Sequence, residues 1–273
     1  MNNKTLIHPT AIIHPGAELD TSVKVGPYSI IGDKVKVGKD TWIGPHVVVS
    51  DRTTIGDSCK LFQFSSVGAP PQDLAYKGEE TETILGNNNV IREFVTIHAG
   101  TAKDTGRTVC GSNILFMNYV HVAHDCNIGD GVILANAATL AGHVTVEEKA
   151  IVGGLVAVHQ FVRIGAFCII GGASAVSKDI PPYVMAVGNR AHVYGLNRIG
   201  LKRQNIPKEE IKEIKEAYNI IFRSQLSIKD AAKKLEDELQ GSKHAQRFIE
   251  FIENATRGIA KERLKKDSET QED

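Results

Sequence analysis

A six-residue repeat runs through most of this chain of 273 residues and constrains its fold more than any other feature. Aliphatic residues recur at every sixth position from Ile7 to Val67 and from Leu85 to Ile97, and the repeat then continues from Cys110 to Val176. A period of six fits neither an α-helix nor a flat strand, whose side chains repeat at about 3.6 and 2 residues. It is typical of a coil in which each short strand sends one aliphatic side chain inward and then turns a corner. The repeat therefore predicts a parallel β-helix in which three hexads, or 18 residues, close one triangular coil.

Glycine and two interruptions mark where the chain leaves the regular strands. Gly26, Gly38 and many other glycines directly follow the inward aliphatic residue, and we interpret them as corner residues because glycine tolerates the positive φ that corners can need. The repeat is broken at residues 68–84 and 98–109, which are too long to be corners. We expect both segments to loop out from the β-helix, where they would be well placed to contact a ligand.

The last third of the chain has a helical pattern. Pro207 suits the first turn of a helix with one apolar face. Ser227 begins a capping box that predicts a helix over 227–240, and a further helix is predicted over about 243–257. That last helix is expected to end before Gly258.

We divide the chain into a β-helix over residues 1–189 and a helical C-terminal domain over residues 190–273. The charged residues from Lys265 to Asp273 are expected to be disordered. The segment from Arg190 to Lys208 holds five basic residues and no acidic one, which favours a docking patch for an acidic partner or a phosphate over a solvated loop.

Composition excludes several other classes of protein. Lys and Arg number 32 and Asp and Glu number 32, a balance that argues against a nucleic-acid-binding protein. No apolar run has the length of a membrane span, and the N-terminus lacks the layout of a signal peptide, so we expect a cytoplasmic protein without stable membrane insertion. The four cysteines show no CxxC spacing, which favours free thiols over a disulfide framework or a metal site.

Residues capable of acid–base chemistry gather between positions 117 and 160. Because one coil contains 18 residues, His124 should stack on Gly142, and Asp125 should stack on His143 in the next coil. His121 precedes an inward valine, so its side chain should point outward near His124. The spacing therefore predicts three imidazoles and one carboxylate on the same outer edge of the β-helix.

Three interpretations of this histidine cluster remain open at the level of spacing. A neutral imidazole oriented by a carboxylate is a suitable general base for a hydroxyl group, and the cluster offers no Ser or Cys with a paired base for a covalent intermediate. The three histidines could instead hold zinc, as in the γ-type carbonic anhydrases, which are also β-helices. They could also be surface polar groups of a non-catalytic trimeric scaffold.

The same stretch carries more apolar side chains than the interior of the coil can hold. One residue per hexad points inward, so the remaining apolar residues must face outward. They predict a buried subunit interface, an apolar ligand groove, or both. These outward residues are Leu115, Met117, Ile133, Ile151, Leu155, Phe161 and Ile169.

These motifs together resemble one known family, the acyl-carrier-protein–UDP-N-acetylglucosamine O-acyltransferases, which carry out the first step of lipid A synthesis. The resemblance covers residues 5 to 260 and adds several motifs to the hexads. They are His121-Val-Ala-His124-Asp125-Cys126, Leu140-Ala-Gly-His143-Val144, Ala157-Val-His159-Gln160-Phe161, Pro71-Gln72-Asp73-Leu74, Pro181-Pro182-Tyr183, Gly195-Leu-Asn197 and Gly200-Leu-Lys202-Arg203.

The resemblance implies a left-handed parallel β-helix that forms a homotrimer with active sites at the subunit clefts. It implies transfer of an R-3-hydroxyacyl chain from acyl carrier protein to the 3-hydroxyl of UDP-N-acetylglucosamine, without a cofactor or a metal. N-acyltransfer to a UDP-amino sugar is the alternative within the same fold and chemistry.

The resemblance also implies roles for individual residues. His124 would be the general base, Asp125 would orient it, and the amide of Gly142 would stabilise the oxyanion. The implied substrate contacts are Gln72, Asp73 and Lys77 for the sugar, His121 and His143 for the sugar or the acyl chain, and His159, Gln160, Asn197 and Arg203 for the nucleotide, its pyrophosphate or the phosphopantetheine arm of the carrier.

Several positions bear on substrate choice. In the family, a residue near Gly172 sets how far the acyl chain extends; glycine there predicts one of the longer hydroxyacyl chains, and Ile169 would trim the space. The sequence departs from the family pattern at Ala75, where lysine is common, at Ile199, where glutamate is common, and at Gln204, which replaces a second arginine. Lys77 would take the place of the missing lysine from a shifted position.

Overall fold

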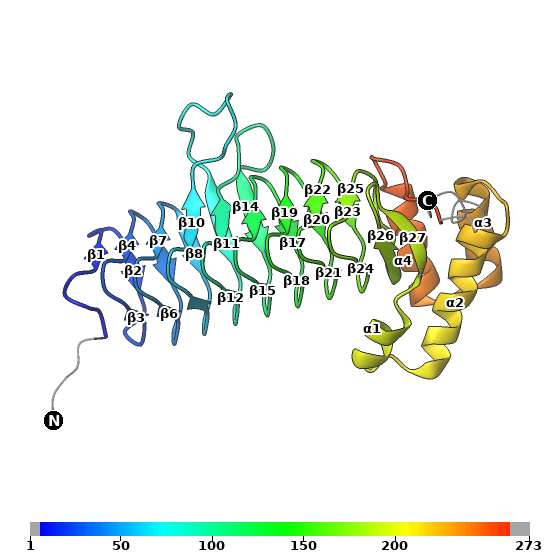
Figure 1. Cartoon of the computed structure of the whole chain (residues 1–273), viewed down its shortest axis with the longest axis horizontal. Coiled ribbons are helices and arrows are strands. Elements are labelled where there is room, and N and C mark those ends of the chain that lie inside the picture. The colour runs from blue at the N-terminus through cyan, green and yellow to red at the C-terminus, as the bar shows by residue number, and fades with distance from the viewer. Residues whose placement is uncertain (1–5, 263–273) are drawn as a thin grey trace, which may run out of the picture.

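Three parallel sheets build a long triangular prism, and a helical layer covers one of its ends (Figure 1). The structure is a computed structural model that describes residues 6–262. Successive strands along the chain visit the first, second and third sheet in turn, so each coil contributes one short strand to every face. The prism confirms the parallel β-helix that the hexads predict.

The first sheet contains, in spatial order, β1 (Ile12–Ile13), β4 (Ile30–Ile31), β7 (Val48–Val49), β10 (Ser66–Ala69), β13 (Thr96–His98), β16 (His121–Val122), β19 (Thr139–Leu140), β22 (Ala157–Val158) and β25 (Ala175–Val176). The second contains β2 (Glu18–Leu19), β5 (Lys36–Val37), β8 (Thr53–Ile55), β11 (Glu82–Leu85), β14 (Arg107–Cys110), β17 (Asn127–Ile128), β20 (Thr145–Val146) and β23 (Arg163–Ile164). The third contains β27 (His192–Leu196), β26 (Val184–Val187), β24 (Ile169–Ile170), β21 (Ile151–Val152), β18 (Ile133–Leu134), β15 (Leu115–Phe116), β12 (Val90–Ile91), β9 (Lys60–Leu61), β6 (Trp42–Ile43) and β3 (Lys24–Val25).

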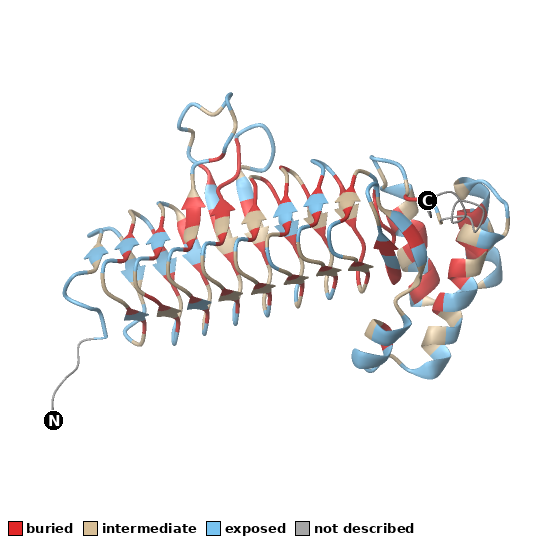
Figure 2. Cartoon of the chain, viewed as in Figure 1, coloured by how far each residue is buried: buried red, intermediate tan, exposed pale blue. Residues whose placement is uncertain are grey.

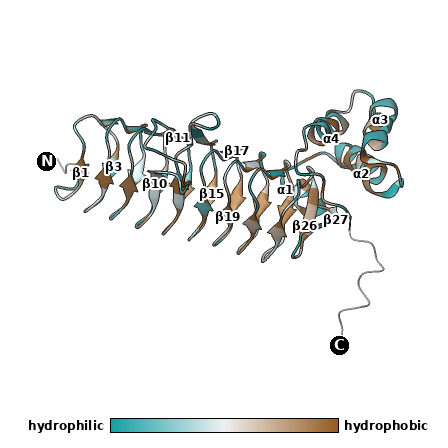
Figure 3. Cartoon of the chain, turned by 90° about the horizontal axis from the view of Figure 1, so that it is seen from above, coloured by the Kyte–Doolittle hydropathy of each residue, from teal (hydrophilic) through white to brown (hydrophobic). Residues whose placement is uncertain are grey.

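The core of the prism contains the inward aliphatic residues of the hexads and, two positions before many of them, a second buried side chain such as Val35 or Val144. The expectation of one inward residue per hexad was therefore wrong, because the corner before each strand also turns a side chain into the core. In each two-residue strand the first side chain faces out and the second faces in, so β24, for example, buries Ile170 and leaves Ile169 half-buried. Every hexad residue from Val25 to Val176 is buried, whereas Ile7 at the open N-terminal end is not (Figure 2). Hydrophobic colour accordingly follows the strands in Figure 3.

The glycines of the hexads are required for a different reason from the one predicted. Positive φ occurs two residues after them, at non-glycine corner residues such as Lys34 and Asp40. A Cβ on Gly38 would lie 2.7 Å from the carbonyl carbon of Gly56 in the next coil. The prediction of a positive φ at these glycines was therefore wrong; they are needed because the backbones of adjacent coils approach too closely there for a side chain.

Two long connections leave the prism at one edge, where the first sheet passes into the second (Figure 1). We call this the loop edge. The first loop, residues 70–81, joins β10 to β11, and the second loop, residues 99–106, joins β13 to β14. The residues flanking each loop belong to these longer strands, so the extruded parts are shorter than the interruptions of the repeat. Figure 1 shows both loops rising side by side from neighbouring coils.

The C-terminal part begins with a hairpin that extends the third sheet beyond residue 189. β26 pairs in parallel with β24, and β27 pairs antiparallel with β26. Four helices follow, namely α1 (Arg198–Arg203), α2 (Lys208–Arg223), α3 (Ile228–Glu238) and α4 (Lys243–Glu253). Pro207 precedes α2, and the side chain of Ser227 caps α3 by accepting from the amide of Asp230, as predicted.

Helices α2 to α4 enclose a second apolar core against the end of the prism. Tyr183, at the last corner, is buried against Phe248. Its hydroxyl oxygen lies 2.9 Å from Nδ1 of His244, with which it shares a hydrogen bond. α4 ends at Glu253, four residues before the predicted end, where the side chain of Asn254 donates to the carbonyl of Glu250. No helix in residues 6–262 is long and apolar enough to cross a membrane. The predicted disordered segment from Lys265 lies outside the described residues.

Candidate active site

The loop edge brings His124 and Asp125 together at the corner between β16 and β17. Nδ1 of His124 lies 2.8 Å from Oδ2 of Asp125. The Asp125 side chain is fully buried, and its backbone has the positive φ of a corner residue, 58°. A buried carboxylate accepts the proton on Nδ1, so this contact selects the tautomer in which Nε2 of His124 carries a free lone pair. This is the geometry that a general base and its orienting carboxylate require.

His143 stacks on this pair from the next coil, as the 18-residue period predicts. Its Nε2 lies 3.7 Å from Oδ2 of Asp125, and its ring meets the His124 ring edge-on with centroids 5.2 Å apart. Its Nδ1 lies 2.9 Å from Oδ2 of Asp104 in the second loop, and Phe161 stacks on its other face. His143 is therefore held on three sides.

Gly142 lies directly against the ring of His124. A Cβ at this position would come within 2.5 Å of Cε1 of His124, so any side chain would push the imidazole away. Among residues 6–262, no protein acceptor takes the amide proton of Gly142. The amide is thus free to donate to a group beside the imidazole, the property that an oxyanion site requires.

His121 and His98 lie next to His124 on the first sheet. Nδ1 of His121 pairs with Oγ1 of Thr96 at 2.7 Å, and the rings of His98 and His121 meet edge-on at 5.1 Å. Burial, and then the charge of His124, lower the pKa of His121. Burial, reinforced by the charges of His121 and His124, lowers the pKa of His98 to about 4. Both rings are therefore neutral at pH 7.

Asp73 of the first loop is the second carboxylate of this region. Its Oδ2 accepts from Nζ of Lys103 in the second loop at 2.7 Å, so an ion pair joins the two loops. The hydrogen bond from Lys103, with the amide of Ala75 next, lowers the pKa of Asp73, and the charge of His124 adds to this. The first loop thus extends its carboxylate toward the histidine cluster.

The remaining predicted substrate contacts are spread along the molecule. Gln72 and Lys77 are exposed on the first loop, and the Lys77 amide donates to Glu79. His159 and Gln160 are exposed one coil beyond His143. His159 lines a pocket of about 390 Å³ that also holds Arg190 and Arg257.

Asn197 and Arg203 lie at the two ends of α1, and Figure 1 shows α1 well away from the two loops. The side chain of Asn197 caps α1, because its Oδ1 accepts from the amide of Gly200, and its Nδ2 donates to the carbonyl of Phe167. Arg203 is exposed in the last turn of α1. Neither residue reaches the histidine cluster within one chain.

The predicted acyl-length residues also face another part of the prism. Ile169 lies in the outer row of the third sheet, paired with Ile151. Gly172 lies at the corner between the third and first sheets, where a Cβ would be 3.2 Å from the carbonyl oxygen of Gly154. Neither belongs to the loop edge that carries His124.

Three residues of the second loop belong to this site and were missed from the sequence. Thr101 contacts Asp125, Lys103 contacts Asp73, and Asp104 contacts His143. The break in the repeat marked the loop as a candidate for ligand contacts. Nothing in the linear pattern, however, indicated which of its side chains would turn back onto the prism.

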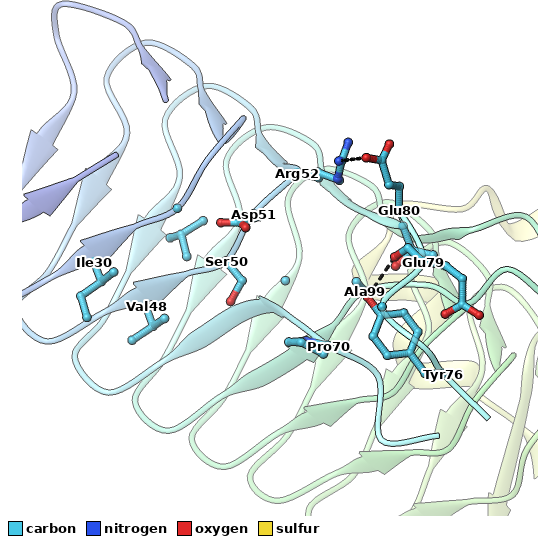
Figure 4. Close-up of a pocket in the computed structure, with 15 residues that line it drawn as sticks. Ile30, Val48, Ser50, Asp51, Arg52, Pro70, Tyr76, Glu79, Glu80 and Ala99 are labelled. Carbon is cyan, nitrogen blue, oxygen red and sulfur yellow. Dashed lines mark hydrogen bonds and ion pairs between the residues drawn. The ribbon is translucent and has the colours of Figure 1, made fainter. Parts of the chain in front are cut away.

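A cavity beside the first loop is separate from the histidine cluster. It has a volume of about 520 Å³ and lies between the first loop and the coils before it (Figure 4). Its walls include Ile30 and Val48 of the first sheet and Tyr76 of the loop, with Arg52 paired to Glu80 at its rim. None of the predicted site residues lines it.

The thiols cannot act as nucleophiles here. All four cysteines are buried and unpaired. Burial raises the pKa of Cys126, the neighbour of Asp125, to about 12. The thiolate is the reactive form, so this residue is inert at neutral pH. The geometry supports direct transfer over a covalent thioester on the enzyme.

The residues of the histidine cluster could also bind a metal ion. His124, Asp125 and His143 each offer a ligand atom, and these three atoms lie within 4.8 Å of one another. Two imidazoles and a carboxylate are a donor set that suits zinc. The arrangement is therefore compatible with both a general base and a metal site.

Comparison with known proteins shows which family this chain belongs to. Residues 179–260 match the family model described as UDP-N-acetylglucosamine O-acyltransferase, domain 2. The chain is 54% identical over 259 residues to the acyl-[acyl-carrier-protein]–UDP-N-acetylglucosamine O-acyltransferase of Herminiimonas arsenicoxydans, covering 93% of this chain and 99% of that protein. The protein of the same name from Thermodesulfovibrio yellowstonii is 52% identical over 255 residues, with the same coverage.

Solved structures are also similar to this chain over almost its whole length. The structure of LpxA from Acinetobacter baumannii superposes with a TM-score of 0.91 at 46% identity, covering 94% of this chain and all of that chain. A UDP-N-acetylglucosamine acyltransferase from Campylobacter jejuni gives 0.90 at 42% identity, again over 94% and 100% of the two chains. The prism is thus a left-handed parallel β-helix, as predicted.

Proposed function

This chain belongs to the family of acyl-[acyl-carrier-protein]–UDP-N-acetylglucosamine O-acyltransferases, and we propose that it works through His124 as a general base. It is an acyltransferase of the first step of lipid A synthesis, with acyl carrier protein as donor and UDP-N-acetylglucosamine as acceptor. The names of the relatives favour none of the alternatives, which were N-acyltransfer, a zinc-dependent hydratase and a non-catalytic scaffold.

The hydrogen bond between His124 and Asp125 carries this proposal. Because Nδ1 donates its proton to the buried carboxylate, Nε2 accepts the proton of the sugar 3-hydroxyl. The hydroxyl oxygen then attacks the thioester carbonyl carbon of an R-3-hydroxyacyl carrier. Asp125 keeps the imidazole in the productive tautomer and stabilises the imidazolium that forms.

The tetrahedral intermediate carries its negative charge beside Gly142. The amide of Gly142 has no protein acceptor within residues 6–262, and its lack of a side chain lets the ring of His124 approach. It donates to the oxyanion. Collapse of the intermediate breaks the carbon–sulfur bond, and His124 gives its proton to the departing thiolate of the carrier, which leaves as the thiol.

Asp73, His121 and His143 would hold the sugar. The pKa of Asp73 is lowered, so its carboxylate is ionised and can accept from sugar hydroxyls, with Gln72 and Lys77 on the same loop. The ring nitrogens of His121 and His143 can exchange hydrogen bonds with the sugar. His159, Gln160, Asn197 and Arg203 would contact the nucleotide or the carrier arm.

A homotrimer would complete the site. In one chain, His124 lies on the loop edge, whereas Ile169 and Gly172 lie on another face, and Asn197 and Arg203 lie beyond the coils. The outer row of the third sheet is apolar and half-buried, with Leu115, Ile133, Ile151 and Ile169 in register. Packing of these rows between subunits would bury them and supply an apolar groove for the acyl chain, which Gly172 would leave open for a long one.

The cytoplasm is the compartment that suits this chain. Its four buried cysteines are unpaired, and a reducing compartment keeps such thiols reduced.

Replacement of His124 by alanine tests the proposed function. Purified protein is assayed with an R-3-hydroxyacyl carrier and UDP-N-acetylglucosamine, and the product is identified by mass. Since a general base contributes a factor of about 10²–10⁴, His124→Ala should lower kcat by at least that lower figure while the protein stays folded. Asp125→Asn should cost less, because it orients the base and does not take the proton.

Two outcomes would count against the proposal. A His124→Ala variant that keeps the wild-type kcat excludes His124 as the base. Stoichiometric zinc in the active wild-type protein, lost in this variant, supports the metal interpretation. Replacing the acceptor with its 3-amino analogue distinguishes ester from amide formation.

A further inference from the structure

Thr101 of the second loop donates two hydrogen bonds to the buried carboxylate of Asp125. The backbone amide of Thr101 donates to Oδ1 of Asp125 at 2.8 Å, and its hydroxyl donates to Oδ2 at 2.7 Å. Thr101 is only 2% exposed, although the loop around it lies at the surface. A loop residue that buries both its polar groups on one carboxylate is unusual, since loop backbones normally turn to solvent.

These two bonds fix the direction in which the carboxylate faces His124. Oδ2 accepts from both Thr101 and Nδ1 of His124, while Oδ1 is occupied by the Thr101 amide. With both oxygens held, the carboxylate cannot rotate about its Cβ–Cγ bond. The amide of Asp125 itself donates to Oγ1 of Thr108, so its backbone is tied to the strand that follows the loop, while its side chain is tied to the loop.

We propose that Thr101 is a positioning residue for catalysis, which acts through Asp125 to hold His124 in place. This rests on the proposed function, in which His124 is the base. The hydroxyl fixes the orientation of the carboxylate, the carboxylate fixes the imidazole, and Nε2 then points at the sugar hydroxyl. The second loop is thereby part of the acid–base machinery as well as a wall of the site.

Replacement of Thr101 by valine removes the hydroxyl group. It keeps the shape of the side chain and the hydrogen bond from the backbone amide of residue 101 to Oδ1 of Asp125. Since misplacement of a catalytic group by about 1 Å can cost a hundredfold, we expect kcat to fall by about 10- to 100-fold. KM for UDP-N-acetylglucosamine and for the acyl carrier should stay within about twofold. Thr101→Ser, which restores a hydroxyl, should recover most of the lost kcat.

A matched control lies on the same loop. Thr105 is exposed, so Thr105→Val makes the same chemical change without touching Asp125, and it should leave kcat and both KM values unchanged. If Thr101→Val does not fold, as judged by its melting temperature, the smaller Thr101→Ala replaces it in every comparison.

A double-mutant cycle separates positioning from a structural effect. If Thr101 acts through Asp125, the change Thr101→Val should have no further effect on kcat in an Asp125→Asn background, because that variant has already lost the charged acceptor. Equal losses in both backgrounds would overturn the proposal, as would an unchanged kcat in Thr101→Val or a Thr101→Ser variant as slow as valine. Failure of the proposed function appears instead in His124→Ala, which would then keep its activity.

Discussion

At the scale of single residues, the corners of the coil determine the chemistry. Asp125 and His143 both have the positive φ of corner residues, and they occupy the same corner in successive coils. Parallel strands in adjacent coils lie about 4.8 Å apart, so the side chains at equivalent corners of two neighbouring coils are close enough to touch. A regular repeat thus delivers an imidazole onto a carboxylate at fixed spacing. Burial then sets how the surrounding histidines titrate.

His98 should make folding sensitive to acid. Burial lowers its pKa to about 4 from the ordinary 6.5, and its Nδ1 has no partner within residues 6–262. Below pH 6.5 the unfolded chain binds a proton at this ring, whereas the folded protein does so only near pH 4. The free energy of unfolding should therefore fall by up to about 3 kcal/mol from this residue as pH drops from 6.5 to 4.

Urea unfolding of the wild type and of His98→Gln at several pH values between 7 and 4 measures this effect. The glutamine side chain does not titrate, so the variant should lose less stability than the wild type over that window. Parallel curves for the two proteins would show that His98 binds its proton equally well in both states.

At the scale of elements, each two-residue strand divides its side chains between core and surface. β6 buries Ile43 completely, while β1 exposes Ile12 with 63% of its surface accessible. The inward side chains of each coil, namely the hexad residues and the buried residues two positions before many of them, supply the hydrophobic stabilisation of the prism. The repeat must therefore be kept in every coil, whereas the outward residues are free to serve binding.

Ile43→Ala and Ile12→Ala form a matched pair that tests this division. Loss of a fully buried isoleucine side chain typically costs about 2–5 kcal/mol, so Ile43→Ala should lower the free energy of unfolding by that amount. Ile12→Ala should change it by about 0.5 kcal/mol or less, as for other surface substitutions. Chemical denaturation of both variants is the measurement, and similar losses in the two would contradict a division of each strand between a buried and an exposed side chain.

At the scale of the whole molecule, the proposed site is distributed over different faces of one prism. The base lies on the loop edge, the acyl-length residues lie near the third sheet, and Arg203 lies in the helical part. Half-buried apolar rows on the third sheet favour association of copies. Association would explain both the apolar surface and the separation of the predicted substrate contacts.

Ile151→Glu should disrupt this association. A charge in the middle of the outer row of the third sheet would be buried without a partner in a trimer, at a cost of several kcal/mol. Analytical ultracentrifugation should show a trimer for the wild type and smaller species for the variant, with loss of activity in parallel. Asn127→Glu, on the exposed outer face of the second sheet, is the control and should remain trimeric. A wild-type protein that sediments as a monomer would contradict the trimer.

The sequence by itself determined the parallel coil, its 18-residue period and the stacking of His143 on Asp125. It could do so because a strict repeat converts separation along the chain directly into distance in space. The helix start at Pro207 and the cap at Ser227 were also predicted, because capping is a local interaction between neighbouring residues.

Only the tertiary structure decided the interactions that have no period. The second loop folds back so that Thr101 holds Asp125, Asp104 holds His143 and Lys103 pairs with Asp73, and these contacts depend on a loop path that no repeat encodes. The hexad glycines were assigned to positive φ, but the close approach of neighbouring coils is what requires them, and that approach exists only once the coils stack. Local pattern fixed which residues could meet in the prism, and packing fixed how they are held.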